Sequence, residues 1–234
     1  MTMKLAIMQP YFFPYLGYFQ LMAAVDFFLI FDDVHFIKKG WIHRNYILLN
    51  QAAHPFTLPI RKMSQNRLIL DHERANPKET VEQQLLLLYH AYHKAPYYAE
   101  VMPHLERMLR NEEANVARYL GHQLETIRDY LGLDTVIHYT SSFENEDHLK
   151  KEARLLDLCN RFDAHHYINP IGGKALYDDE TFERAGVHLE FLEMQPFSYR
   201  QFGDVFVPNL SIIDVLMFNP RARVQQLLDT HSFN

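Results

Sequence analysis

The amino-acid sequence predicts a doubly wound α/β fold, with a mostly parallel sheet and an all-helical insertion. Two short apolar runs, at residues 5–8 and 27–31, flank a helical pattern, which is typical of a βαβ unit. Short strand-like and helical patterns alternate again after residue 134. Between them, residues 77–132 carry helical periodicity throughout. We therefore expect one domain, residues 1–234, with the helical insertion at about 77–132.

The segment after the second strand, residues 34–59, mixes short β-like pieces with polar turns. The pieces at 45–49 and 55–60 predict irregular β structure lying against the edge of the sheet.

Three helices are expected in the insertion. Asn76, Pro77 and Glu79 form a capping box with a first-turn proline, which opens the first helix. A second helix is expected from Pro96, with Pro103 kinking it or marking its true start. The third runs over 115–131 and ends at Gly132.

The remaining chain returns to strands and helices in alternation. Strands are expected at 135–139, 166–169 and 187–192, and helices at 147–162 (capped by Asn145), 179–185 (stopped by Gly186), 211–218 and 220–229. Strands separated by helices favour a parallel sheet with right-handed crossovers, Rossmann-like or HUP-like in type.

Composition excludes several classes of protein. A formal net charge of −6 argues against a general nucleic-acid binder. The lone cysteine, Cys159, has apolar neighbours and cannot form an internal disulfide, which fits a reducing compartment. No signal-peptide pattern is seen, and no apolar run approaches the roughly 20 residues of a membrane helix. We expect a cytoplasmic protein without an integral membrane segment, whose oligomeric state the sequence leaves open.

Unusual residues follow each of the five expected parallel strands. Because the carboxyl ends of parallel strands meet at one edge, these segments should converge there on a small molecule. The segments are 9–18, 32–45, 140–142, 169–177 and 195–199.

Two of these segments suggest anion binding. Gly172-Gly173-Lys174 offers backbone N–H groups and a point charge, although a plain turn with an exposed lysine is the commoner meaning of such a motif. The basic patch around Trp41 suits a phosphate-bearing ligand stacked on an indole, or else an edge strand protected by charge. The residues expected to bind substrate or its anionic group are Gln9, Tyr11, Tyr15, Gly17, Tyr18, Lys38, Lys39, Trp41, Arg44, Asn45, Gly172, Gly173, Lys174 and Tyr177.

Asp32, Asp33 and His35 are the candidate catalytic residues. Carboxylates at the end of a strand can hold sugar hydroxyls or act as a base, or simply cap a turn. His90 and His93, like the adjacent His165 and His166, have no third ligand at metal spacing, so no metal is expected.

Tyr15-Leu16-Gly17-Tyr18 stands where nucleotidylyltransferases and class I aminoacyl-tRNA synthetases keep an HxGH-like motif. Tyrosines replace both histidines here, and a phenol is a poor cation for stabilising phosphate charge. The placement is similar, but the chemistry stays open.

Long blocks of the sequence resemble the WbqC-like proteins. The blocks are residues 9–19, 26–28, 32–45, 94–98, 172–178 and 210–216, beginning with Gln9-Pro10-Tyr11-Phe12-Phe13-Pro14-Tyr15-Leu16-Gly17-Tyr18. The chain departs from the family pattern at His43 and at Asn169-Pro170, where Asn and Ser-Gly are expected. The resemblance implies a step in bacterial O-antigen or related surface-glycan (lipopolysaccharide) biosynthesis, on a nucleotide-activated or lipid-linked sugar.

Three functional hypotheses follow. The first is a transferase for a nucleotide-linked sugar or an activated small acid, including acyl or glycyl transfer. The second is a non-catalytic protein of the same pathway that binds a sugar nucleotide or a partner. The third is a degenerate nucleotidylyltransferase or adenylate-forming enzyme.

Overall fold

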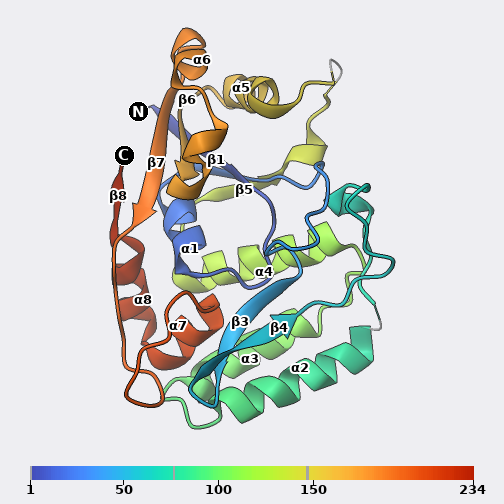
Figure 1. The fold of residues 1–234 in the computed structure, drawn as a ribbon, viewed down its shortest axis with the longest axis vertical. Helices are drawn as coiled ribbons and strands as arrows, with labels where there is room; N and C mark the ends of the chain where they lie inside the picture. The colour runs from blue at the N-terminus through green and yellow to red at the C-terminus, as the bar shows by residue number, and fades with distance from the viewer. Residues whose placement is uncertain (1, 76, 146–147) are drawn as a thin grey trace.

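A computed structural model describes residues 2–75, 77–145 and 148–234. It shows a mixed α/β structure whose largest sheet has the strand order β5-β2-β1-β6-β7-β8. The strands are β1 (Met3–Met8), β2 (Phe27–Ile30), β5 (Val136–Tyr139), β6 (Ala164–Pro170), β7 (His188–Met194) and β8 (His231–Phe233). All five predicted strands lie in this sheet and run parallel, and β8 adds an antiparallel edge that the sequence did not predict (Figure 1).

The chain reverses its direction across the sheet after β5. It moves outward from β1 through β2 to β5, then returns to the other side of β1 with β6 and β7. The connections from β1 and β6 therefore leave in opposite directions, and ligands commonly bind at such a switch point.

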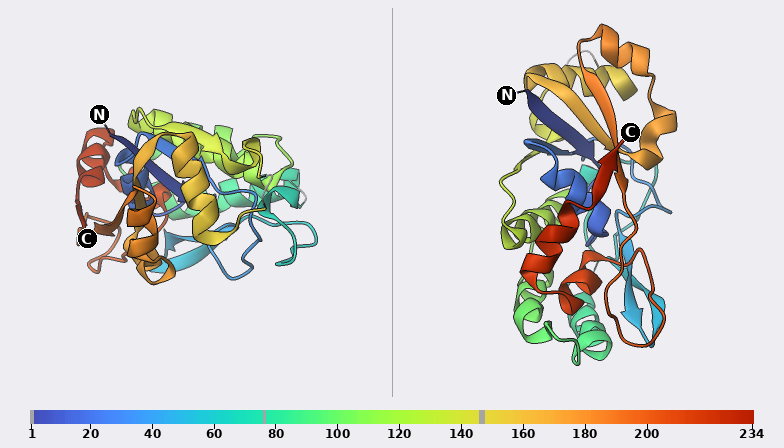
Figure 2. Two further views of the ribbon diagram at one scale, coloured as in Figure 1. Left: turned by 90° about the horizontal axis from the view of Figure 1, so that it is seen from above. Right: turned by 90° about the vertical axis from the view of Figure 1, so that its left-hand side faces the viewer.

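Helices cover both faces of the sheet because its strands alternate apolar side chains between the two faces. On one face, Ala6 and Phe28 belong to the large core that includes α1 (Leu16–Ala23). On the other, Leu5 and Tyr167 pack with residues of α5 (Lys151–Arg161) and α6 (Asp179–Arg184). Figure 2 shows α5 and α6 on one side of the sheet and the remaining helices on the other.

The predicted helical block is present as α2 (Pro77–Tyr92), α3 (Tyr98–Leu109) and α4 (Val116–Leu131). Asn115 caps α4 by accepting a hydrogen bond from the Arg118 N–H at 3.1 Å, and Gly132 ends it with a φ of 72°. Pro103 lies inside α3, whose start is two residues after the predicted Pro96. The predicted cap Asn76 lies outside the described residues.

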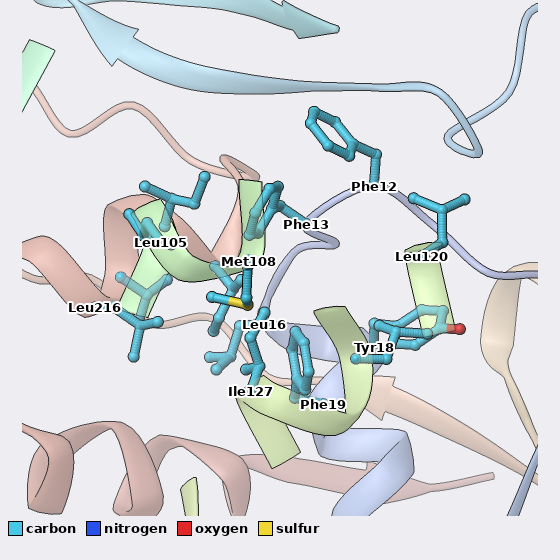
Figure 3. Close-up of a cluster of buried hydrophobic side chains, with 14 of the residues drawn as sticks. Phe12, Phe13, Leu16, Tyr18, Phe19, Leu105, Met108, Leu120, Ile127 and Leu216 are labelled. Atoms are coloured by element: carbon cyan, nitrogen blue, oxygen red, sulfur yellow. The ribbon is translucent and has the colours of Figure 1, made fainter. Parts of the chain in front are cut away.

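The aromatic loop after β1 belongs to the core that joins this block to the sheet. Phe12 and Phe13 from the loop meet Leu105 of α3, Leu120 of α4 and Leu216 of α7 (Ile212–Phe218) in one buried cluster (Figure 3). The aromatic residues of this loop thus fold over the protein's own interior.

The segment predicted as irregular β structure forms a regular hairpin, β3 (Arg44–Leu49) and β4 (Ala52–Thr57), in a sheet of its own. Its loop residues, Asn50 and Gln51, have φ values of 51° and 62°, which is the conformation of a type I′ turn. The chain closes through α7, α8 (Arg221–Leu228) and β8, and Ser211 caps α7 by accepting from the Ile213 N–H.

The start of α5 differs from the prediction. The Asn145 side chain accepts a hydrogen bond from the Leu149 N–H at 2.8 Å, and the helix begins at Lys151. The predicted first residue, Asp147, lies outside the described residues. In the described ranges, none of the helices has the length and apolar character needed to cross a membrane.

Candidate functional site

Asp32 and Asp33 follow β2 and are joined to the end of β5. Asp32 is buried and accepts hydrogen bonds from the Ser141 N–H at 3.0 Å and the Ser141 hydroxyl at 2.7 Å. The Thr140 hydroxyl contacts both carboxylates. Both carboxylates are therefore held in position by groups that donate to them.

Arg154 of α5 is buried beside this pair, with 2% of its side chain exposed. Its guanidinium lies 3.5 Å from Asp33 and 2.8 Å from Asp157, and it donates to the carbonyl oxygens of Thr140 and Phe143. A buried guanidinium needs such partners to offset its lost hydration, so these contacts lock α5 against the carboxyl edge of the sheet.

A cleft of about 470 Å³ opens next to Asp33. Its lining consists of Phe31, Asp33, Val34, His35, Leu68, Asn145, His148, Leu149, Lys150, Lys151 and Arg154. The lining includes Lys150 and Lys151, which form no ion pair within the described ranges, whereas Arg154 is already paired with Asp33 and Asp157. This volume suits a small organic ligand, and the excess of positive charge favours an anionic one.

The structure brings two of the three candidate catalytic residues to this cleft. Asp33 and His35 line it, whereas Asp32 is buried beneath the edge. The His35 side chain is exposed, and its backbone pairs with Leu68 in an antiparallel bridge. Of the three, the imidazole of His35 is therefore the most accessible to a ligand.

The predicted basic patch lies outside the lining of the cleft. Lys38 and Lys39 are exposed, and Arg44 donates to the Lys39 carbonyl at 2.6 Å. Trp41 is 43% exposed and meets the ring of Tyr46 edge to face at 6.1 Å. The basic patch is therefore separate from the cleft, and the Trp41 indole is exposed on it.

Several predicted site residues of the aromatic loop pack against one another. Tyr18 is buried and donates its hydroxyl to the Gln9 carbonyl at 2.9 Å. A Cβ at Gly17 would lie 2.5 Å from the ring of Tyr15, so glycine is needed for that ring to cover the start of α1. Burial, with Tyr15 nearby, raises the pKa of Tyr11 to about 12 and keeps its phenol neutral.

Asn45 holds this loop from the hairpin. Its amide donates to the carbonyl of Phe13 at 2.7 Å, and the Ser211 hydroxyl donates to the same oxygen at 2.7 Å. Phe13 has a φ of 41°, an uncommon conformation for a residue with a side chain, and these two bonds stabilise it.

The glycine segment forms a second place on the carboxyl edge, after β6. Gly172 has open space around it, whereas a Cβ at Gly173 would overlap the side chain of Asn169. The Asn169 amide donates to the hydroxyls of Tyr167 and Tyr177 at 3.0 and 3.3 Å. Lys174 is exposed, with its Nζ 5.7 Å from the centre of the Phe191 ring. None of these residues lines the 470 Å³ cleft.

Sequence reasoning did not single out Lys150, Lys151 or Arg154. The signal available was a pair of lysines just before a helix, but only the packing of α5 on the sheet brings them to Asp33.

The chain has relatives in sequence but no significant match among solved structures. It is 27% identical over 227 residues to a Mycobacterium tuberculosis (strain ATCC 25618 / H37Rv) protein described as uncharacterized protein Rv1507c, and the match covers 96% of this chain and 97% of that one. The sequence profile of the WbqC-like protein family matches residues 9–226, and the chain therefore belongs to that family.

Proposed function

We propose that the cleft beside Asp33 binds an anionic small molecule, such as the diphosphate of a nucleotide-linked sugar, and that the protein transfers a group to or from it. The observation that carries this proposal is the pair Lys150 and Lys151 in the lining of a cleft whose one carboxylate, Asp33, is already paired with Arg154. The position of the cleft supports it, because ligands of open α/β sheets bind beyond the carboxyl ends of the strands, and the cleft lies beyond β2 and β5. Family membership is the ground for proposing a cytoplasmic step in surface-glycan assembly.

His35 is the proposed base. Its exposed imidazole stands in the cleft, where it could take a proton from an attacking hydroxyl or amine. Asp32 and Asp33 already accept hydrogen bonds from the end of β5, so their proposed role is to orient neighbouring groups.

A non-catalytic binding protein is the second candidate. The hydrogen bonds that Asp32 and Asp33 already accept favour it, because neither carboxylate is left as an obvious base. A nucleotidylyltransferase-like use of the loop at Tyr15 receives less support, since Tyr18 is buried and the Tyr15 ring covers Gly17.

Calorimetric titration with UDP, ADP and their sugar conjugates tests the binding site. Replacing Lys150 and Lys151 together by Ala should weaken binding at least tenfold at low ionic strength, because two charges near the phosphates are lost. Lys38→Ala and Lys174→Ala are the matched controls, since both lysines are exposed and lie outside the cleft lining. If those controls weaken binding instead, the anion is held by the predicted patch or the glycine segment, and the cleft proposal is wrong.

His35→Ala distinguishes an enzyme from a binding protein. Once a transferred product is detected by mass spectrometry, the enzyme proposal predicts a loss of kcat of about 10²-fold or more with little change in the ligand Kd. Unchanged turnover would remove His35 as the base. A ligand that binds without any product under all donor and acceptor pairs would favour the binding protein.

A further inference from the structure

Three potential metal ligands meet on the sheet, away from the cleft. His166 of β6 and His188 of β7 are direct cross-strand partners, and Glu190 lies two residues after His188. Because side chains alternate between faces along a strand, all three project from one face. One ligand atom from each lies within 4.8 Å of the others.

Glu190 lies between the two imidazoles. One carboxylate oxygen is 3.2 Å from His166 Nδ1, and the other is 3.7 Å from His188 Nε2. The two rings are 5.2 Å apart and nearly perpendicular. Ligand atoms about 2.0–2.2 Å from a tetrahedral Zn²⁺ are roughly 3.3–3.6 Å from one another. Each imidazole therefore lies near metal-site distance of one oxygen of Glu190, and a small rotation of the carboxylate would bring a single oxygen toward both rings.

We propose that His166, His188 and Glu190 bind a divalent transition-metal ion, with Zn²⁺ the best fit. Two imidazole nitrogens and one carboxylate oxygen are a ligand set that Zn²⁺ uses in proteins, with water in the fourth position. Mg²⁺ and Ca²⁺ prefer oxygen ligands throughout, so they fit this set poorly.

The surroundings allow an ion to enter. The side chain of His188 is 62% exposed, while His166 and Glu190 are about a quarter exposed, so the site opens to solvent on one side. Lys4 of β1 is the register partner of His166 on its other side. In the described part of the chain the ion-pair contacts of Glu190 are with His166 and His188 alone, so a bound metal ion would replace these contacts without displacing a lysine or arginine.

The bound ion would tie β6 to β7. The site lies in the first half of both strands, whereas the cleft lies at the carboxyl ends of β2 and β5, so metal binding is separate from the proposed transfer site. Its expected effect is on stability, because an ion that binds the folded chain raises the melting temperature by mass action.

The full-length protein, freed of any affinity tag and treated with EDTA, provides the test. Titration calorimetry with ZnCl₂ should show one tight equivalent, and Co²⁺ should give the visible absorption of a tetrahedral site. His188→Ala and Glu190→Gln should each weaken Zn²⁺ binding at least tenfold and abolish the rise in melting temperature. His165→Ala is the matched control, because this exposed histidine neighbours His166 in the chain but does not belong to the cluster of three ligands.

Neither substitution is expected to disturb the fold. His188 is largely exposed and Glu190→Gln keeps the shape of the side chain, so circular dichroism should show both variants folded. Absence of a stoichiometric site in the parent protein would overturn the proposal. So would Zn²⁺ binding that survives in both variants, or that His165→Ala weakens to the same extent.

Discussion

Asp214 is a buried carboxylate held by neutral donors. It accepts hydrogen bonds from the hydroxyls of Tyr92 at 2.9 Å and Tyr199 at 2.6 Å, and from the Gln201 amide at 2.6 Å. The Tyr92 hydroxyl in turn accepts from the Leu48 N–H, so the network joins α7 to α2 and the hairpin. Single residues of this kind hold distant segments together, because a buried polar group is stabilised only when it is paired.

Asp214→Asn should lower the free energy of unfolding at pH 7 by about 1–3 kcal/mol. The reason is that the NH₂ group of Asn is a donor and would face neighbouring donor groups, which would then lack an acceptor. Urea denaturation followed by circular dichroism measures this change. Asp229→Asn, at an exposed position, should leave the free energy within about 0.5 kcal/mol of the parent. Equal stability of the two variants would mean that the network is energetically neutral.

The same residue predicts a pH dependence. Burial raises the pKa of Asp214 above its usual value of 3.8. A group whose pKa is raised on folding contributes stability that is fully present below the unfolded pKa and is lost as the pH rises through the folded pKa. The difference in unfolding free energy between the parent and Asp214→Asn should therefore be largest near pH 4 and narrow toward pH 7. A difference that widens over this range would show that the hydrogen bonds outweigh burial.

At the scale of elements, the side chain of Tyr139 at the end of β5 packs against α4 at Gly121. A Cβ there would overlap the hydroxyl end of Tyr139, the last residue of β5, and Arg118 of α4 stacks on the same ring with its Cζ 3.9 Å from the centre. The tyrosine hydroxyl can lie this close to the helix because residue 121 has no side chain.

Gly121→Ala should destabilise the protein by about 1–3 kcal/mol, because overpacking outweighs the roughly 1 kcal/mol that alanine contributes to a helix. Chemical denaturation measures the loss. Gly172→Ala is the control, since a Cβ at Gly172 meets nothing within 4 Å. A stabilised Gly121→Ala variant would show that Tyr139 moves aside at little cost.

At the scale of the whole molecule, one large core connects the helical block with the sheet. It runs from Ala6 in β1 through Leu105 in α3 to Leu228 in α8, while a smaller core containing Leu158 lies across the sheet under α5. Because the sheet strands contribute to both cores, we expect the chain to unfold as a single unit.

Leu105→Ala and Leu158→Ala test this expectation on the two sides of the sheet. Both leucines are fully buried, so each change should cost about 2–5 kcal/mol and shift one common transition. Far-ultraviolet circular dichroism and tyrosine absorption should report coincident curves. Leu86→Ala, at an exposed position, should change the stability by less than about 0.5 kcal/mol. Two separate transitions would show that the helical block is an independent domain.

Local patterns in the sequence were enough to predict most elements. The runs at 5–8 and 27–31, the cap at Asn115 and the stop at Gly132 depend on neighbours within a few residues, and the structure confirms them. The short strand β8 and the later start of α5 at Lys151 were not predicted, because three residues of strand carry little periodicity and Asn occurs in turns as readily as at helix caps.

Tertiary structure alone decides which charged and polar side chains from different elements come into contact. Arg154 reaches Asp33 only because α5 packs across the end of β2, and His166 meets Glu190 only through the register of β6 on β7, 24 residues apart. Sequence periodicity determines which face of its own strand or helix a residue occupies. Which residue of another element stands opposite depends on the packing of the whole core, whose contacts join residues far apart in the chain.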